Sequence, residues 1–420
     1  MAINTSWTVK IGTVASPTNF TSRVLSMQID QQVDVNVIGR GVCRITLLNK
    51  DGALTPGGGG TYGTTDWFAQ GVFVACLTNT GGADTTHQVF HGIVIDFDLQ
   101  DDGVYSTVTI TAQDGLSVAG RTQNVALPAA VTTNYSVVAP ASLGNGYASG
   151  YALNYPRLGA STATAAWTNL ATSDPIVTTT TSLYSTAADL LQTAVIPSVN
   201  DVMWATTITG TTTATYTTVS IPNTNSRAVA NQTDFEFDPA SGVSGSKLPF
   251  DVFTFQQGFN NDTLITGASI KGSFGGATTQ TSTATTVNTY GNRTSAYLAT
   301  YVETDTAAST MATKLVNRYG TSRFTPISLQ LSATLVKRLA SDSAVGKWRH
   351  LLDVEKGFWQ RAKITWTGSG AASQTAYCVI KGRSISVTPA DTVVTLSLGN
   401  WADNHGFILD TDQLNVDRLG

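Results

Sequence analysis

Two stretches far apart in the chain, VFHGIVIDFDLQDDGVYSTVTI at residues 89–110 and VIKGRSISVTPADTVVTL at residues 379–396, share one layout. Each has an apolar pair, a glycine, alternating apolar positions, a polar turn and a Val-rich return strand, which together predict a β-hairpin. When Gly92 is aligned with Gly382, the second turn is four residues shorter. The alignment also matches four apolar pairs: Ile95 with Ile385, Phe97 with Val387, Val108 with Val394, and Ile110 with Leu396. The repeat predicts two related β-barrels, one towards each end of the chain.

The composition favours strands and loops over helices. Charged residues make up 12% of the 420 residues, against roughly 25% in an average soluble domain. Glu occurs three times and Lys ten times, whereas Thr, Ser, Gly and Asn are abundant. Because Glu and Lys normally cover exposed helices and Thr favours strands, this composition indicates a mainly β protein and excludes a helix bundle or coiled coil.

Hydropathy, cysteines and charge predict a protein that folds in the cytoplasm. The mean hydropathy is +0.03, no apolar run approaches the ~18–20 residues that cross a bilayer, and the first residues lack the features of a signal peptide. Cys43, Cys76 and Cys378 are odd in number and widely spaced, which favours reduced thiols over a disulfide framework. The net charge is −4 with no basic cluster, so contact with DNA should be passive.

The first half of the chain divides into a strand-rich part and a Thr-rich part. Residues 1–121 contain several short alternating strands separated by Gly-rich turns, which predict an N-terminal β-barrel. Residues 122–225 are rich in Thr, Ser and Ala, and predict an inserted domain of irregular β structure. Apolar residues recur at helical spacing in residues 182–195, so this inserted domain should contain one helix.

The second half predicts an α+β domain followed by another barrel. Residues 226–325 form the α+β domain, part of which could belong to the second barrel. Its helix is predicted at 305–319 from the apolar stripe Ala308, Met311, Ala312, Leu315, Val316 and Tyr319. Residues 326–420 predict the second β-barrel, including a strand at 348–352, and a C-terminal tail.

Six segments, taken in order, resemble a known protein family. They are GRGVCRITLLNKDGALTP (39–56), AQGVFVACLTN (69–79), VFHGIVIDFDL (89–99), VTITAQDGLSV (108–118), NTYGNRTSAYLATYVETDTAASTMATKLVNRYGTSRFTPISLQLS (288–332) and VIKGRSISVTPADTVVTLSLGNWADNHGFILD (379–410). The segments resemble the opening domain, helical segment and closing hairpin of bacteriophage tail hub proteins, also called baseplate hub or minor tail proteins of the tail tip. Residues 122–225 match no motif of that family.

The resemblance implies a structural virion protein that has no enzymatic activity and needs no cofactor. Its fold would be mainly β with a few short helices: two β-barrels like those of tail-tube proteins, plus inserted α+β domains. Three protomers with two barrels each would form a pseudo-six-fold ring at the distal end of the phage tail, adapting a hexameric tail tube to a three-fold partner. The implied partners are the tail-tube protein, a spike, tip or fibre protein, other baseplate proteins, the tape-measure protein and DNA in passage, without membrane insertion.

Loop and hairpin residues are the candidate assembly contacts. The four-glycine run cannot hold regular structure, and it lacks the following Lys-Ser/Thr of a phosphate-binding loop. We expect contacts between barrels or with the tube at this loop and at the two hairpin tips, through Pro56, Gly57, Gly58, Gly59, Gly60, Tyr62, Trp67, Asp101, Asp102, Pro389 and Asp391.

Metal-binding and catalytic sites are not predicted. His87 and His91 lie four residues apart on a predicted strand, a separation of ~13 Å that is too long for one ion. Glu236 lies among alternating acidic and Phe residues, which is typical of an ordinary half-buried strand. The acidic group Asp96, Asp98, Asp101 and Asp102 lacks the pattern of a calcium loop and is expected to be a solvated hairpin tip.

Two other functions remain open from the sequence. Thr- and Asn-rich strands with exposed Trp also suit a carbohydrate-binding receptor-recognition tail protein or a β-rich adhesin. The tryptophans that could stack on sugars, or instead anchor barrels and subunit contacts, are Trp7, Trp67, Trp348, Trp359, Trp366 and Trp401. A β-rich glycosidase is the third interpretation, and it would depend on Glu236.

Overall fold

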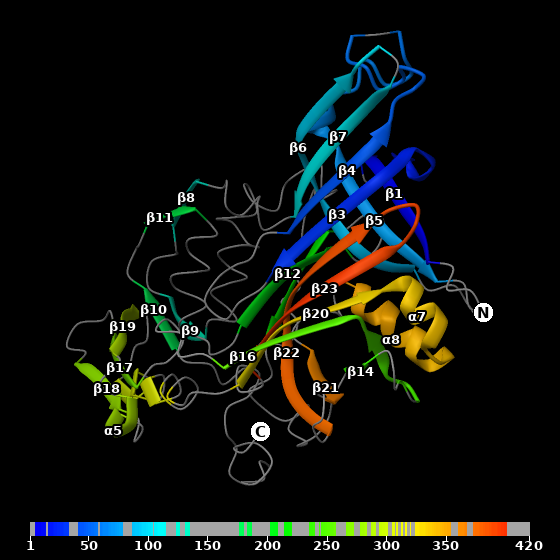
Figure 1. Cartoon of the computed structure of the whole chain (residues 1–420). Coiled ribbons are helices and arrows are strands. Elements are labelled where there is room, and N and C mark those ends of the chain that lie inside the picture. The colour runs from blue at the N-terminus through cyan, green and yellow to red at the C-terminus, as the bar shows by residue number, and fades with distance from the viewer. Residues whose placement is uncertain are drawn as a thin grey trace.

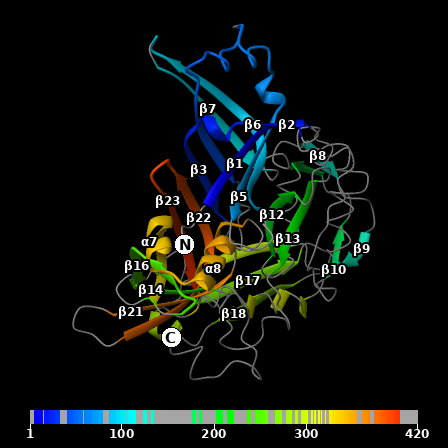
Figure 2. The same cartoon turned by 90° about the vertical axis from the view of Figure 1, so that its right-hand side faces the viewer.

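The computed structural model contains one large curled sheet with smaller elements beside it (Figures 1 and 2). It describes residues 5–13, 16–32, 41–57, 59–78, 86–103, 105–114, 123–126, 131–134, 176–179, 183–186, 202–208, 214–220, 235–239, 243, 245–257, 266–272, 278–283, 287–290, 294–300, 305–306, 308–309, 312–313, 316, 320, 324–353, 360–367 and 373–400. The large sheet has 14 strands. None of the described helices is long and apolar enough to span a membrane.

Seven of these strands, all from the first 114 residues, form the N-terminal unit. They are β1 (Thr5–Thr13), β2 (Ser16–Asn19), β3 (Val24–Gln32), β4 (Val42–Leu48), β5 (Gly71–Thr78), β6 (Thr86–Asp101) and β7 (Ser106–Asp114). Their order in the sheet is β2-β1-β5-β6-β7-β4-β3, with every neighbouring pair antiparallel. Short 3-10 helices lie at η1 (Thr21–Arg23) and η2 (Trp67–Ala69).

The other seven strands form the C-terminal unit and repeat the same order. They are β14 (Phe235–Pro239), β15 (Leu248–Phe250), β16 (Val252–Gln257), β20 (Phe324–Ser332), β21 (Arg361–Thr367), β22 (Ser373–Val387) and β23 (Thr392–Asn400), arranged β15-β14-β21-β22-β23-β20-β16. The two units differ at β14, which runs parallel to β15 and β21, where β1 is antiparallel to β2 and β5. The duplication predicted from two hairpins therefore extends over seven strands.

Hydrogen bonds at the two hairpin tips fix how the hairpins correspond. The N–H of Asp102 donates to the carbonyl of Tyr105, and the N–H of Thr388 donates to the carbonyl of Asp391. The pairing register also shifts once in each hairpin, at a β-bulge that contains Ile95 in β6 and Lys381 in β22. Turns and bulges coincide when residues 93–114 are matched with residues 379–400 without a gap.

This correspondence keeps two of the five predicted pairs and corrects the other three. Val108 with Val394 and Ile110 with Leu396 are equivalent, and all four side chains are buried. The outgoing strand is displaced by four residues: Gly92 corresponds to Cys378 rather than Gly382, Ile95 to Lys381 rather than Ile385, and Phe97 to Arg383 rather than Val387. The second turn is not shorter than the first.

Sheet membership also moves the start of the C-terminal unit. The sequence places the second barrel from residue 326, whereas the sheet already includes β14, β15 and β16 from residue 235 onward. The chain leaves this sheet after β16 and returns at β20. In between lie β17 (Gly267–Gly272), β18 (Thr279–Thr283), α5 (Val287–Tyr290) and β19 (Thr294–Thr300), with β17, β18 and β19 in a sheet of their own.

Of the two predicted helices, the one at 305–319 agrees with the described residues and the one at 182–195 does not. The described residues within 305–316 are helical, and Ala308, Ala312 and Val316 are buried at intervals of four residues, as the stripe predicts. The remaining stripe residues Met311, Leu315 and Tyr319 lie outside the described part. In the predicted helix at 182–195, Leu183–Thr186 is instead strand β11, and residues 187–195 lie outside the described part.

Residues 122–225 contribute three two-stranded sheets in their described part. The pairs are β8 (Gln123–Ala126) with β11, β9 (Val131–Asn134) with β10 (Ile176–Thr179), and β12 (Val202–Ile208) with β13 (Ala214–Ser220), all antiparallel. These pairs are regular β structure, and the prediction of one inserted domain over residues 122–225 stays a prediction.

Two helices fill the connection between β20 and β21. Helix α7 (Ala333–Leu339) is capped at its N-terminus by the side chain of Ser332, and α8 (Asp342–Leu352) is capped in the same way by Ser341. The sequence predicts a strand at 348–352, which is wrong because these residues close α8. Trp348, Leu351 and Leu352 are all fully buried. They can share one face of α8 because residues three and four positions apart lie on the same side of a helix.

Candidate assembly surface

Eight strands, four from each unit, form a continuous band through the molecule. The order of this band is β16-β20-β23-β22-β3-β4-β7-β6, and β22 with β3 is the pair that joins the two units. One row of directly paired residues crosses seven of these strands: Ser332, Val393, Ser386, Gln28, Arg44, Thr111 and Asp96. Directly opposed residues share a face of a sheet, so the band presents one surface built from both units.

That surface is polar and nearly uncharged. In β7 the side chains alternate between buried and half-buried along the whole strand, with Thr107, Thr109 and Thr111 on the side away from the core. Ser, Thr and Gln occupy most equivalent positions of the other strands. The charged side chains that the described residues place here are Asp30, Asp96, Asp98, Arg44 and Lys381. A face with so few charges attracts neither polyanions nor polycations strongly.

The joint between the units contains a buried cation, Arg383 of β22. Its Nε and Nη2 donate to Oε1 of Gln31 in β3 at 2.9 and 2.8 Å. Its Nη1 donates to the carbonyls of Leu351 and Asp353, at the end of α8, at 2.6 and 2.9 Å. Burial lowers the pKa of Arg383 to about 9. The side chain therefore links β22, β3 and α8, with a further bond of 3.3 Å to the carbonyl of Val89 in β6.

Close backbone approach explains the glycine next to this arginine. A Cβ at Gly382 would lie 2.9 Å from the carbonyl oxygen of Gln31 and 3.2 Å from Cα of Gln32. A Cβ at Gly92 would lie 2.2 Å from the carbonyl oxygen of Gln113. Both glycines let a neighbouring strand approach closely, although they occupy different positions in the two hairpins.

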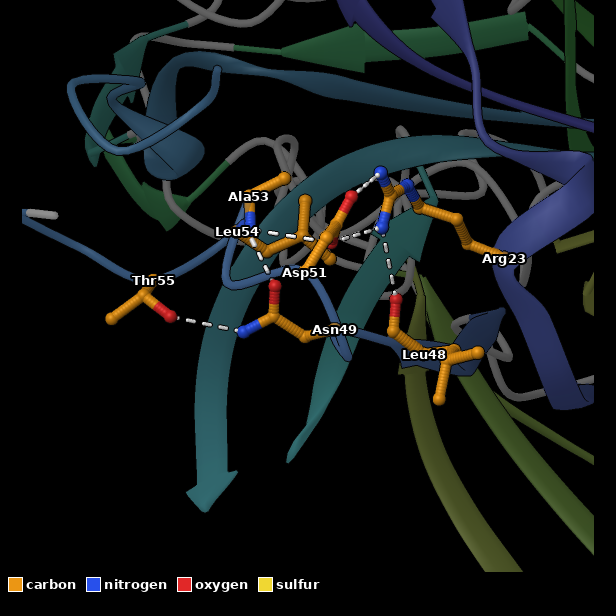
Figure 3. A network of polar contacts seen from close by, with 7 residues as sticks. All are labelled: Arg23, Leu48, Asn49, Asp51, Ala53, Leu54 and Thr55. Atoms are coloured by element: carbon orange, nitrogen blue, oxygen red, sulfur yellow. Dashed lines mark hydrogen bonds and ion pairs between the residues drawn. The ribbon is translucent and has the colours of Figure 1, made fainter. Parts of the chain in front are cut away.

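A polar network shapes the loop that follows β4 (Figure 3). The fully buried Asn49 donates from Nδ2 to Oγ1 of Thr55 and to Oγ of Ser106, both at 3.0 Å, and its Oδ1 accepts from the N–H of Leu54 at 2.8 Å. At the loop surface Arg23 makes two bonds to the Asp51 carboxylate, at 2.8 and 2.6 Å. These bonds hold the pKa of the Asp51 carboxyl well below its usual range.

Aromatic rings hold the far end of the same loop against the sheet. Trp67 is buried and stacks on Phe97 of β6, with ring centroids 5.1 Å apart. Phe20 and Tyr62 lie on its other sides, at 6.0 and 6.4 Å. The loop is therefore fixed at both ends, beside the β6–β7 hairpin at the top of Figure 1.

Comparison with known proteins gives a fold but no sequence family. No family model matches the chain, and no curated protein matches it. The crystal structure of the tail protein from Neisseria meningitidis MC58 superposes with a TM-score of 0.54 at 10% identity, covering 96% of this chain and all of that one. This chain has a tail-protein fold.

Two further solved structures show weaker similarity. They are the 43 kDa tail protein of prophage MuSo2 from Shewanella oneidensis, with a TM-score of 0.48, 10% identity and coverage of 94% and 98%, and the prophage tail protein gp18 from Listeria monocytogenes EGD-e, with a TM-score of 0.47, 11% identity and coverage of 93% and 94%. The Neisseria meningitidis tail protein alone confirms the resemblance to tail hub proteins, at the level of the fold.

Within the tail-protein fold, the predicted contact residues fall into two separate groups. Around the N-terminal hairpin, Pro56, Gly57, Gly59, Asp101 and Asp102 are exposed, Gly60 and Tyr62 are half-buried, Trp67 is buried, and Gly58 lies outside the described part. The exposed Phe68 and Tyr105, at 49% and 52%, belong to this group, and the sequence did not single them out. The sequence signal that could have found them is an aromatic residue beside a predicted contact, Phe68 next to Trp67 and Tyr105 next to the Asp101–Gly103 turn.

The C-terminal hairpin tip is engaged within the chain. Pro389 is exposed, but Oδ1 of Asp391 accepts from the N–H of Thr334 at the start of α7. The next residue, Thr392, accepts a bond of 3.2 Å from the indole of Trp7 in β1. This hairpin tip therefore lies against α7 and the N-terminal unit, separate from the contact residues around the N-terminal hairpin.

Among the histidine and cysteine side chains considered for a chemical site, His91 and the three cysteines are buried in the core. No group of three His, Cys, Asp or Glu that could hold a metal ion occurs among the described residues. His91 is buried and stacks on Phe73 at 4.5 Å, and this burial lowers its pKa to about 3. The thiols Cys43, Cys76 and Cys378 are all buried and free, and burial raises the pKa of Cys76 to about 12.

Glu236 and four of the candidate tryptophans belong to strand and core packing. Phe235 and Phe237, on either side of Glu236, are buried, as the alternation predicts. Asp238 is also buried and pairs with Lys247 at 2.9 Å. Trp67 and Trp348 lie in the core, while Trp7 and Trp366 pack against it. Trp67 and Trp348 are buried, Trp7 and Trp366 are half-buried, and Trp359 and Trp401 lie outside the described part.

Proposed function

We propose that this chain is a structural tail hub protein that works as a homotrimer. The observation that carries the proposal is the repeated seven-strand order, since two similar units in one chain give three chains six similar positions. A ring of six units can stack on a hexameric tail tube, while the inserted segments, which occur once per chain, keep three-fold symmetry. That three-fold side would receive a spike, tip or fibre protein at the distal end of the tail.

The polar face of the eight-stranded band would line the bore of this ring. Its side chains are mostly Thr, Ser and Gln, and its two cations, Arg44 and Lys381, are outnumbered by three carboxylates, so the face offers DNA no extended cationic surface. DNA and the tape-measure protein could then pass without lasting contacts. The role that we propose is structural and involves no catalysis.

The predicted contact residues around the N-terminal hairpin form the surface that we assign to the tail tube. It combines exposed aromatic rings, Phe68 and Tyr105, with the exposed acidic tip Asp101 and Asp102. Aromatic rings surrounded by polar groups are typical of the centres of protein interfaces. Other baseplate proteins would bind the outside of the ring.

Electron microscopy of the purified chain, alone and mixed with a tube subunit, tests this function. We expect closed particles of three chains whose projections show six similar lobes, and stacking of tube protein on one face. Particles that remain monomeric at all concentrations, or rings built from six chains, would contradict it. A glycan array provides the comparison with the receptor-binding alternative, because a hub should bind no sugar specifically.

A further inference from the structure

We propose that the outer half of β6, residues 96–101, pairs as an antiparallel strand with β16 of a second copy of this chain. The register would be the one in which β22 pairs with β3 inside a single chain. The proposal rests on the proposed function, which supplies a ring of three copies, and it adds the strand pair that closes this ring.

The template for the contact is the joint between the two units. Residues 382–387 of β22 pair with β3, from Gly382 opposite Gln32 to Val387 opposite Met27. On its other edge, the same part of β22 pairs with β23 of its own hairpin. One unit therefore donates the outer half of its long hairpin strand to the third strand of the other unit.

Each partner in this joint has a counterpart at an end of the band. The turn and bulge correspondence matches residues 382–387 of β22 with residues 96–101 of β6. Through their neighbours β4 and β20, β3 corresponds to β16, so that Met27 matches Phe253 and Gln28 matches Thr254. Since Ser386 lies opposite Gln28, the register places Gln100 of one copy opposite Thr254 of the next.

The outer half of β6 has the features of a strand that lacks its second neighbour. Residues 96–101 pair with β7 on one edge, while pairing with β5 ends at Ile93, and the described sheet has no strand beyond. The N–H of Phe97 donates to the carboxylate of the adjacent Asp96 at 3.0 Å rather than to β7. This donor therefore points to the outer edge, where a new strand would receive it.

Burial differs between the equivalent positions in the expected direction. Arg383 and Ile385, which face β3, are buried, whereas their counterparts Phe97 and Leu99 are only half-buried. A strand laid along β6 would cover the exposed parts of both side chains. The buried state of β22 thus shows what the neighbouring strand adds at these positions.

A second copy, turned by one ring position, is the occupant that the charges favour. The outer half of β6 carries Asp96, Asp98 and Asp101, so pairing two copies through this strand would place carboxylates near one another. Strand β16, with the sequence VFTFQQ, has no charged residue. Because β6 and β16 lie at opposite ends of the band, their pairing is head-to-tail and can close a ring.

Disulfide trapping of Gln100→Cys with Thr254→Cys tests the proposal. Both side chains are exposed, and the outward N–H of Phe97 makes Gln100 a non-hydrogen-bonded position towards the new strand, where Cα atoms lie ~4.5 Å apart and a disulfide can form. The native cysteines are buried and should not interfere. We expect oxidation to convert most of the double variant into covalent dimers and trimers on a non-reducing gel, and each single variant to stay monomeric on that gel.

The matched control is Gln28→Cys with Ser386→Cys, which occupies the equivalent joint inside one chain. It should form a disulfide without any increase in mass. If microscopy shows three-chain rings but Gln100→Cys with Thr254→Cys gives no covalent oligomer, the strand pair is overturned and the hub function stands. If no rings form at all, both proposals fail.

Discussion

The N-terminal and C-terminal units have the same strand order but fill one equivalent connection differently. Between β4 and β5 the chain forms a loop held by Asn49, the Arg23–Asp51 pair and Trp67, whereas between β20 and β21 it forms α7 and α8. The loop stands beside an exposed hairpin, and the helices cover the core and receive Arg383. The same strand order can thus carry one connection that lies at the surface and another that packs against the joint between the units.

Arg383→Met should produce the largest loss of stability. The equivalent residue in the N-terminal unit is Phe97, so an apolar side chain fits this strand position. In the C-terminal unit it would leave Gln31 and the carbonyls of Leu351 and Asp353 without their buried donor. We expect a loss of about 3–5 kcal/mol in the free energy of unfolding, measured by urea denaturation. Phe97→Met is the matched control and should cost less than half as much; equal losses would break the comparison.

Acid should weaken the N-terminal unit through His91. Its folded pKa, about 3, lies below its ordinary value near 6.5, so the unfolded chain takes up the proton first. The stability from neutral His91 is complete above pH 6.5 and is lost as the pH falls towards 3, at up to about 1.4 kcal/mol per pH unit. His91→Phe should flatten the unfolding free energy between pH 6 and 4, and an unchanged slope would exclude His91 as its source.

Asn49→Ala should loosen the loop while sparing the helical connection. It removes the acceptor of the Leu54 N–H and the donor to Ser106, both in buried positions. We expect a loss of about 2 kcal/mol, with hydrogen exchange accelerated in residues 49–55 and unchanged in α8. Faster exchange in α8 as well would show that the two connections are not independent.

Asp51→Asn should have the smallest effect. The carboxylate is 54% exposed and the Arg23 side chain 27%, so solvent screens the pair. We expect a change of about 0–1 kcal/mol despite the lowered pKa of Asp51. A larger loss, measured in the same denaturation assay and reproduced by Arg23→Gln, would assign the surface pair a greater share in holding the loop.

The sequence predicted the repeat because its return strands, around Val108 and Val394, keep the same buried spacing. The sequence alignment misplaced the outgoing strands because it matched Gly92 with Gly382. Each glycine allows a neighbouring strand to approach closely, but the two occupy different positions along their hairpins. Sequence alone does not record which neighbour approaches. The seven-strand order was similarly hidden, since a 66-residue interval separates β16 from β20.

Local patterns failed where tertiary contacts decide the structure. Residues 348–352 are apolar enough for a strand, but α8 forms because Ser341 caps it and its buried side chains all meet the core. Arg383 was not singled out because an arginine in an alternating strand is usually solvated. Its role depends on Gln31, which is 352 positions away in the chain.

Electron microscopy of the purified chain with a label on each unit shows whether both units of one chain occupy positions in the same ring. A small tag at the exposed Pro56 loop and another at the exposed Pro389 tip would mark the two units separately. We expect rings of three chains, in which the two labels alternate around six similar lobes. Rings in which the labels occupy two different layers, or in which six chains each contribute one lobe, would contradict it.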